Sequence, residues 1–239
     1  MLTQRLSLTN QDARKINASR LHILGSIAET ADGRVYRYSL AGGTSLAPGK
    51  LDVAATVDAN ATNKTIARTV ADGQFEVVFD AGGTIVEDAY QDGFLTINDA
   101  TGEGITYAIA GNTGVTGAGE ITVRLKEPLI VGLTIDVSEA TLTQSPWDSV
   151  VISVADQLDM PVGVANNAIT NAYYGWVQTR GIASVLADEA IAIGSAVVCG
   201  SSTVGAVEAM DTDDICAQVG VAIVAGVDTE YREIYLTID

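Results

Sequence analysis

The sequence is poor in the residues that carry most enzyme chemistry. It has one histidine, two cysteines and only 5% aromatic residues. The histidine, His22, is accompanied by no G-x-S-x-G nucleophile elbow, which disfavours Ser-His-Asp and Cys-His catalysis. The 30 acidic residues offer many carboxylate pairs, but no pair stands out as a glycosidase site. We therefore expect a protein that is not an enzyme and takes no cofactor.

Metal ligands in a suitable spacing are also missing. Cys199 and Cys216 are 17 residues apart, with no C-x-x-C motif and no histidine nearby, which excludes a zinc site of three or four N/S ligands. The acidic run Asp211–Asp214 lacks the central glycine and the distal glutamate of a calcium loop. We expect no metal site. The two cysteines are predicted to be buried thiols, with a disulfide between them as the open alternative.

Positive charge is scarce, because 13 Lys and Arg residues face 30 Asp and Glu residues and the net charge is −17. Such a surface repels phosphate backbones, so no nucleic-acid partner is expected, and its general effect is solubility. No run of about 18 apolar residues is present, so no membrane span is expected. The first residues lack the apolar region of a secretory signal, which favours assembly inside a cell.

The sequence does contain short apolar runs that alternate with turn residues. In Tyr173–Glu208 and Gln218–Asp239 these runs recur at intervals of about eight to twelve residues, which is typical of a small antiparallel barrel or sandwich. From Ala31 onward the pattern is also that of β-strands separated by turns. No span of about twelve residues has the i, i+3, i+4 pattern of a helix. The predicted fold is all-β, with two small antiparallel β-barrel or sandwich domains preceded by an extended N-terminal arm. The predicted bounds are residues 1–30 for the arm, 31–150 for the first β domain and 151–239 for the C-terminal β-barrel domain.

One glycine-rich stretch invites comparison with a phosphate-binding loop. It contains Gly111, Gly114, Gly117 and Gly119, between the predicted strands Gly104–Ala110 and Glu120–Leu129. A dinucleotide fingerprint requires a helix after the glycines, and a P-loop requires G-K-[ST]. The segment that follows here alternates apolar and polar residues as a strand does. The glycine-rich stretch is therefore predicted to be the tip of a long hairpin.

Two features favour contact with a partner. The N-terminal segment concentrates basic residues in an acidic chain, which suits docking on an acidic surface, with a solvated terminus as the alternative. The stretch YYGW is the most aromatic point of the chain and predicts a core or subunit contact, with sugar stacking as the lesser alternative. The candidate partner-binding residues are Arg5, Arg14, Lys15, Arg20, Tyr173, Tyr174 and Trp176.

The C-terminal half contains YGWVQTRG, SVLADEAIAIGSAVV, TVGAVEA, QVGVAIVAG and EIYLTID in succession. This series resembles small β-rich virion proteins of tailed bacteriophages, most closely the capsid decoration (cement) proteins. The upstream run DGRVYRYSLAGGTSLAPGKL resembles the opening of structural proteins from aquatic phages. The shell-forming capsid protein itself is not expected, because its long spine helix has no counterpart here.

The resemblance implies a protein of the virion that is assembled in the host cytoplasm and sits on the capsid exterior. There it would bind the major capsid protein, clamp neighbouring subunits and associate with itself as a homotrimer. Two alternatives stay open. One is another virion component, such as a head fibre, tail tube or baseplate protein, and the other is a glycan-binding β module.

Overall fold

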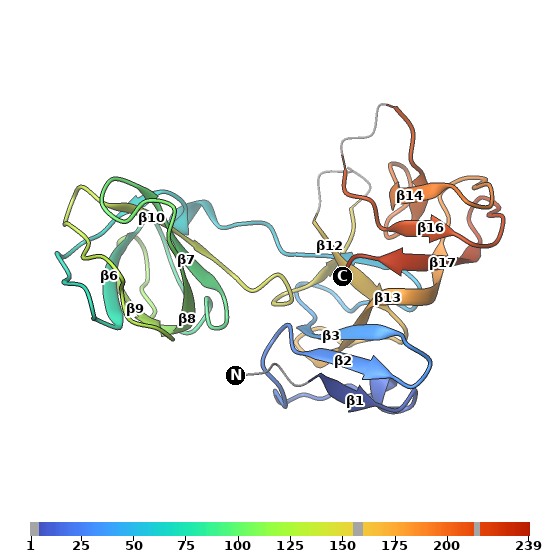
Figure 1. Ribbon diagram of the computed structural model, residues 1–239, viewed down its shortest axis with the longest axis horizontal. Helices are drawn as coiled ribbons and strands as arrows, with labels where there is room; N and C mark the ends of the chain where they lie inside the picture. The colour runs from blue at the N-terminus through green and yellow to red at the C-terminus, as the bar shows by residue number, and fades with distance from the viewer. Residues whose placement is uncertain (1–4, 155–159, 213–215) are drawn as a thin grey trace. The chain divides into compact units, whose positions relative to one another are not determined.

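The computed structural model describes residues 5–154, 160–212 and 216–239, and the fold is all-β as predicted (Figure 1). Helical structure within these ranges is limited to the 3-10 turns η1 (Asp12–Arg14) and η2 (Ala59–Ala61). Contacts between residues divide the chain into two compact units. Unit 1 comprises residues 1–55 and 146–239, and unit 2 comprises residues 56–145.

Unit 1 is organised around one sheet in the order β1-β2-β3-β13-β17-β16-β14-β15. Strand β12 pairs with both β13 and β4, and β4 also pairs with β11. The strands are β1 (Leu6–Leu8), β2 (Ile27–Thr30), β3 (Val35–Leu40), β4 (Leu51–Val53), β11 (Val151–Ile152), β12 (Pro161–Ala165), β13 (Tyr174–Leu186), β14 (Ala196–Cys199), β15 (Val207–Ala209), β16 (Gly220–Ala222) and β17 (Tyr231–Thr237).

Strand β13 is the longest strand of unit 1 and changes partners along its length. Its first half pairs with β3 and β12, and its second half, from Arg180, pairs with β17. The register against β3 shifts between Gln178 and Arg180, which marks a β-bulge that bends the strand. Gly181 follows with φ of +88°, a conformation that other residues rarely adopt.

Three buried clusters of unit 1 meet on β13. Trp176 packs with Tyr36 and Tyr38 in one cluster, and Val177 packs in a second. Val185 belongs to the third, which lies among β14, β15 and β17. Because one strand supplies side chains to each cluster, the clusters depend on its path through the sheet.

The predicted boundaries at residues 30 and 150 differ from these units. Residues 5–30 form part of the first sheet rather than an extended arm, because β1 pairs in parallel with β2 and β2 pairs with β3. Ala13 and Leu24 are buried in the cluster that contains Trp176. The sequence conceals this packing, since the buried residues of the segment follow neither a strand nor a helix period. Residues 31–55 likewise pair with C-terminal strands instead of joining unit 2.

Unit 2 is a sheet in the order β5-β10-β7-β8-β9-β6 that closes almost into a barrel. An antiparallel bridge between Ile66 and Phe79 links its two ends. The hairpin between β8 and β9 confirms the prediction for the glycine-rich stretch 111–119. The strands are β5 (Lys64–Thr65), β6 (Glu76–Ala81), β7 (Phe94–Asp99), β8 (Thr106–Asn112), β9 (Gly119–Leu125) and β10 (Glu139–Thr143), and their inward side chains form one apolar core.

The connection between the units identifies unit 2 as an insertion. Strand β4 ends at Val53 and β11 begins at Val151, and these two residues are direct antiparallel partners. The chain therefore leaves unit 1 and returns to it at one point, between two paired strands. The predicted boundary near residue 150 lies close to the point where the chain returns to unit 1. The sequence predicted no boundary near residue 55, where the chain leaves unit 1.

We predict that unit 1 folds without unit 2. If a short Gly-Ser linker replaces residues 56–145, it has to join only the paired ends of β4 and β11. Closing such a small loop costs little conformational entropy. The shortened chain should show a cooperative thermal transition and a dispersed amide NMR spectrum. A chain that aggregates or lacks a transition, while residues 56–145 fold alone, would show that unit 1 depends on its insert.

A second feature of unit 1 is a fully buried acid in β4. Asp52 is 0% exposed and lies between Ile152 of β11 and Gly163 of β12. Neither carboxyl oxygen has a hydrogen-bond partner among the described residues. Burial raises the pKa of Asp52 well above its ordinary value, and the nearby backbone amide of Ala165 offsets this only in part. The carboxyl therefore stays protonated in the folded protein at pH values where it ionises in the unfolded chain.

We predict that Asp52→Asn changes how stability depends on pH. A carboxyl with a raised pKa stabilises the fold fully below its unfolded pKa of about 3.9, and this contribution is lost as pH rises toward the folded pKa. Its share of the free energy of unfolding should fall by up to about 1.4 kcal/mol per pH unit in that window. The free energy of unfolding of Asp52→Asn, relative to that of the natural protein, should therefore increase from pH 4.5 to pH 8 in urea titrations. Parallel pH profiles for the two proteins would contradict the assignment.

Candidate functional site

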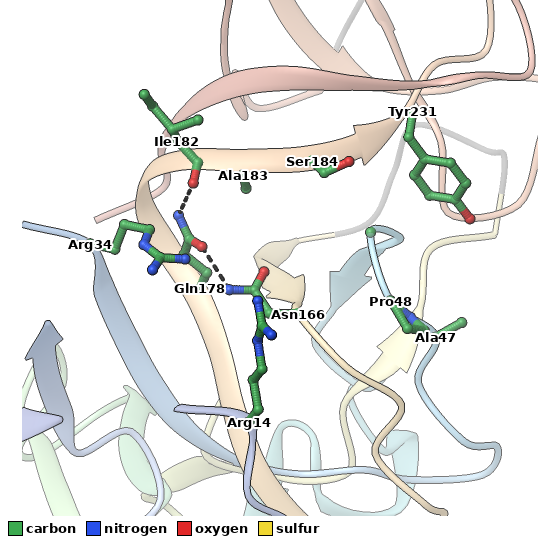
Figure 2. Close-up of a pocket in the computed structure, with 11 residues that line it drawn as sticks. Arg14, Arg34, Ala47, Pro48, Asn166, Gln178, Ile182, Ala183, Ser184 and Tyr231 are labelled. Atoms are coloured by element: carbon green, nitrogen blue, oxygen red, sulfur yellow. Dashed lines mark hydrogen bonds between the residues drawn. The ribbon is translucent and has the colours of Figure 1, made fainter. Parts of the chain in front are cut away.

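A cavity of about 580 Å³ opens in unit 1 beside the bend of β13. Its walls come from η1, the start of β3, the loop before β4, the end of β12, the second half of β13 and the start of β17. We call it the arginine pocket (Figure 2). Its lining residues are Arg14, Arg34, Ala47, Pro48, Gly49, Asn166, Gln178, Ile182, Ala183, Ser184 and Tyr231.

The floor of the arginine pocket is a pair of side-chain amides. Gln178 is 0% exposed, and its Oε1 accepts a hydrogen bond of 2.9 Å from Asn166 Nδ2. Its Nε2 donates to the carbonyl oxygens of Arg180 and Ile182, both at 3.0 Å, so this amide spans the bulge of β13. Asn166 Nδ2 also donates to the Tyr36 hydroxyl at 3.0 Å. Each polar atom of the buried Gln178 side chain is thus satisfied, which holds the bend rigidly.

Two guanidinium groups extend toward this floor in Figure 2, and they differ in their partners. Arg34 Nε and Nη2 donate to Asp32 Oδ2 at 3.0 and 2.8 Å, and Nη2 also donates to Asn10 Oδ1 at 2.8 Å. The Asp32 carboxylate raises the pKa of Arg34, while the hydrogen bond from Arg34 holds the pKa of Asp32 far below its ordinary value. The Arg14 guanidinium makes no hydrogen bond or ion pair within the described residues.

The opposite wall of the pocket is apolar. The Tyr231 ring, which is 48% exposed, lies against Gly49, where a Cβ would come within 2.7 Å of the ring. Gly49 also has φ of +71°, so a residue with a side chain is disfavoured there on two grounds. Pro48 and Ala47 lie on the same side of the pocket as Tyr231, whereas Ile182 lies on the other side, near Arg34. The pocket therefore pairs a cationic side with an apolar side.

A second hollow of about 510 Å³ adjoins the arginine pocket. It shares Arg34 and Ile182 with the first and adds Asp32, Gly33, Gly181 and Tyr235. Ile182 and Tyr235 are direct partners across β13 and β17, and they are 52% and 39% exposed. The two hollows thus belong to one surface, which we call the docking face and define by Arg14, Arg34, Ile182, Tyr231 and Tyr235.

Of the four basic residues predicted to bind a partner, Arg14 alone lines the arginine pocket. Arg5 forms an ion pair of 3.0 Å with Glu29, and Lys15 forms one of 2.7 Å with Asp12. Hydrogen bonds from Lys15 and Thr9 lower the pKa of Asp12 to about 2. Arg20 Nε donates to the carbonyl oxygen of His22 at 2.9 Å. The basic residues do not converge on one site.

The three predicted aromatic residues lie in or against the core. Trp176 is 5% exposed and packs edge-on to Tyr38 with ring centroids 5.0 Å apart, so the prediction that it contacts a partner is corrected. Tyr174 stacks on Tyr38 at 5.8 Å, and Tyr173 is half-buried against a neighbouring cluster. His22 joins the same aromatic group, 5.5 Å from the Trp176 ring. Their burial supports the core interpretation of YYGW over sugar stacking.

Sequence reasoning missed Arg34, Asn166, Gln178 and Tyr231 as members of one site. They lie up to about 200 residues apart in the chain, and only the pairing of β3, β12 and β17 with β13 brings them together. One signal was present in the sequence. Gln178 interrupts the otherwise apolar run of YGWVQ, and a buried amide in a strand requires hydrogen-bond partners.

The cysteines and the acidic run can also be placed. Cys199, which is buried, and Cys216, which is half-buried, are thiols rather than a disulfide, and Cys199 packs in the cluster that contains Val185. Asp213 and Asp214 of the acidic run lie outside the described residues. Over the described ranges, no helix is long and apolar enough to cross a membrane.

We predict that Trp176→Ala lowers the free energy of unfolding by about 3–5 kcal/mol, because it removes a buried aromatic ring from a packed cluster. Urea unfolding followed by the fluorescence of Trp147, the second tryptophan of the chain, reports on unit 1. Tyr235→Ala serves as the control and should cost less than about 1 kcal/mol, since that ring is exposed. Equal losses for the two variants would contradict the assignment of Trp176 to the core.

The docking face offers guanidinium groups, hydroxyl groups, a carboxylate and apolar surface. Among the described residues, no group of three or more His, Cys, Asp or Glu side chains could hold a metal ion. No protein-family model, curated protein or solved structure matches this chain. Its function is therefore inferred from the residues of this face and from the resemblance in the sequence.

Proposed function

We propose that this protein is a non-catalytic structural protein of a tailed-bacteriophage virion, and that it decorates the capsid exterior by binding the major capsid protein. The observation that carries the docking role is the composition of the docking face. In a chain with a net charge of −17, this face combines two arginines with exposed tyrosine and isoleucine side chains, and its deeper pocket is lined by no acidic residue.

This composition is that of a protein-binding surface. Tyr and Arg are enriched among the residues that contribute most to binding energy, and Lys, Glu and Asp are depleted at interface centres. Single exposed apolar residues need no explanation, but Ile182 and Tyr235 are neighbours across two strands, and Tyr231 lies further along the same face of β17. Glu233 lies between Tyr231 and Tyr235 on this face, so the docking face presents exposed aromatic and aliphatic side chains beside charges of both signs.

The capsid as the partner rests on the sequence resemblance. Two aspects of the structure support this role. A clamp needs a sturdy body, and unit 1 supplies an eleven-stranded sheet with three buried clusters. A clamp also has to contact neighbouring subunits, and unit 2, which has a separate core, offers a second body for such contacts. A homotrimer on the shell is part of the same proposal.

The test is binding to empty expanded shells of the phage that encodes the protein. We expect the protein to cosediment with the shells and to raise their melting temperature. Ile182→Asp should weaken binding by about tenfold or more, because a charge would replace an apolar contact at the centre of the docking face. Ile193→Asp is the matched control, since Ile193 is equally apolar, 69% exposed and outside this face.

Three other outcomes would redirect the proposal. Shell binding that is unchanged by Ile182→Asp would place the contact elsewhere on the molecule. Hexameric rings or long tubes in solution, without shell binding, would favour a tail component over a decoration protein. Specific retention on a glycan array, again without shell binding, would favour a glycan-binding module. Light scattering of the free protein gives its oligomeric state directly.

A further inference from the structure

We propose that the arginine pocket binds a carboxylate carried on an apolar or aromatic body, supplied by an Asp or Glu side chain in an exposed segment of the partner protein. Only the identity of the partner protein rests on the proposed function. The chemical class of the ligand is inferred from the residues of the pocket.

The uncompensated positive charge of the pocket favours a ligand with one negative charge. Arg34 is already neutralised by Asp32, whereas Arg14 makes no ion pair within the described residues. Basic side chains elsewhere are commonly taken up by carboxylates of the chain, as in Arg5–Glu29 and Arg68–Glu120. Arg14 is thus an uncompensated cation beside a cavity in a strongly acidic protein. A monoanion matches it, and a dianion would leave a negative charge unpaired.

The donors of the pocket favour a carboxylate over a phosphate. The planar fork of a guanidinium binds a carboxylate through two parallel hydrogen bonds. The amide hydrogens on the floor are occupied, because Gln178 Nε2 donates to two carbonyls and Asn166 Nδ2 donates to Gln178 and Tyr36. The hydroxyl groups of Ser184 and Tyr231 are the additional donors on the wall. A phosphate would find few partners for its further oxygens.

The size of the cavity requires more than a carboxylate. A volume of about 580 Å³ lies in the range of sites that hold whole small molecules or large side chains. The Tyr231 ring, Pro48 and Ala47 provide an apolar wall for the body of the ligand. The side-chain carbonyl oxygen of Asn166 accepts no hydrogen bond from the described residues, so it can accept one from an N–H group of the ligand, such as a peptide amide.

The second hollow indicates that the ligand belongs to a protein chain. It continues past Arg34 and Ile182 to Tyr235, so the contact surface extends beyond one enclosed site. An extended segment whose acidic residue enters the arginine pocket would place its neighbours over Tyr235. An isolated small molecule would use the first hollow alone.

The test uses the full-length protein and short capped peptides, followed by calorimetry and by the NMR signals of the arginine side chains. The probe is acetyl-Leu-Glu-Phe-amide, and its neutral match is acetyl-Leu-Gln-Phe-amide. The Glu peptide should bind saturably, and the Gln peptide at least about tenfold more weakly. Arg14→Gln should reduce binding of the Glu peptide by a similar factor, and Arg14→Lys by less, since lysine keeps the charge but not the fork.

Arg180→Gln is the matched control. Arg180 is an exposed arginine of the same sheet that lines neither hollow, so this variant should bind the Glu peptide as the natural protein does. Equal binding of the Glu and Gln peptides, or equal loss in Arg14→Gln and Arg180→Gln, would overturn the carboxylate site. Inorganic phosphate that displaces the Glu peptide with higher affinity would overturn the preference for carboxylates. Binding of acetyl-phenylalanine but not of the Glu peptide would overturn the assignment to a protein partner.

The same variants separate this inference from the proposed function. If shells bind the natural protein and Arg14→Gln equally well, the pocket proposal fails and the decoration role stands. If the Glu peptide binds through Arg14 but shells do not bind, the decoration role fails and the pocket proposal stands.

Discussion

The bend in β13 is the constraint on which unit 1 depends. A single strand must pair with β3 and β12 at one end and with β17 at the other, and the bulge at residues 178–180 with Gly181 allows this change of direction. Gln178 holds the bend by donating to two backbone carbonyls from a fully buried position. Loss of that amide would remove the donor that joins the backbone carbonyls of Arg180 and Ile182 across the bulge.

The same bend creates the pocket. Before it, Gln178 lies on the floor with Asn166, and after it, Ile182 and Ser184 stand on the wall. The hydrogen bonds that stabilise the bulge therefore also occupy the amide donors of the floor, and Arg14 is left as the dominant polar group available to a ligand. The Gln178 amide thus stabilises the bulge and also determines which donors of the pocket stay available.

The sequence predicts local features well and long-range pairing poorly. Alternation in Glu120–Leu129 correctly predicted a strand, although β9 ends at Leu125, and the glycines before it correctly predicted a hairpin, because both depend on neighbouring residues. The insertion of unit 2 depends on the pairing of Val53 with Val151, which leaves no local pattern. The supposed arm failed for a related reason, since its buried residues, such as Ala13 and Leu24, contact Trp176 through tertiary packing alone. Arg14 could be named as a candidate, but its pocket could not.

In β13 and β17, the residues that stabilise the fold and the residues of the docking face lie on opposite faces of the strands. Because successive side chains of a strand point to opposite faces, Ala183 and Val185 enter the core while Ile182 and Ser184 remain outside. In β17 the pattern repeats, with Ile234 and Leu236 buried and Tyr231 and Tyr235 exposed. Changes at the outer positions leave the packed residues in place, so the residues of the docking face can be substituted without a large loss of fold stability. Under the proposed docking role, the side chains that β13 and β17 contribute would bind from a rigid sheet, so affinity would not be reduced by the ordering of mobile loops.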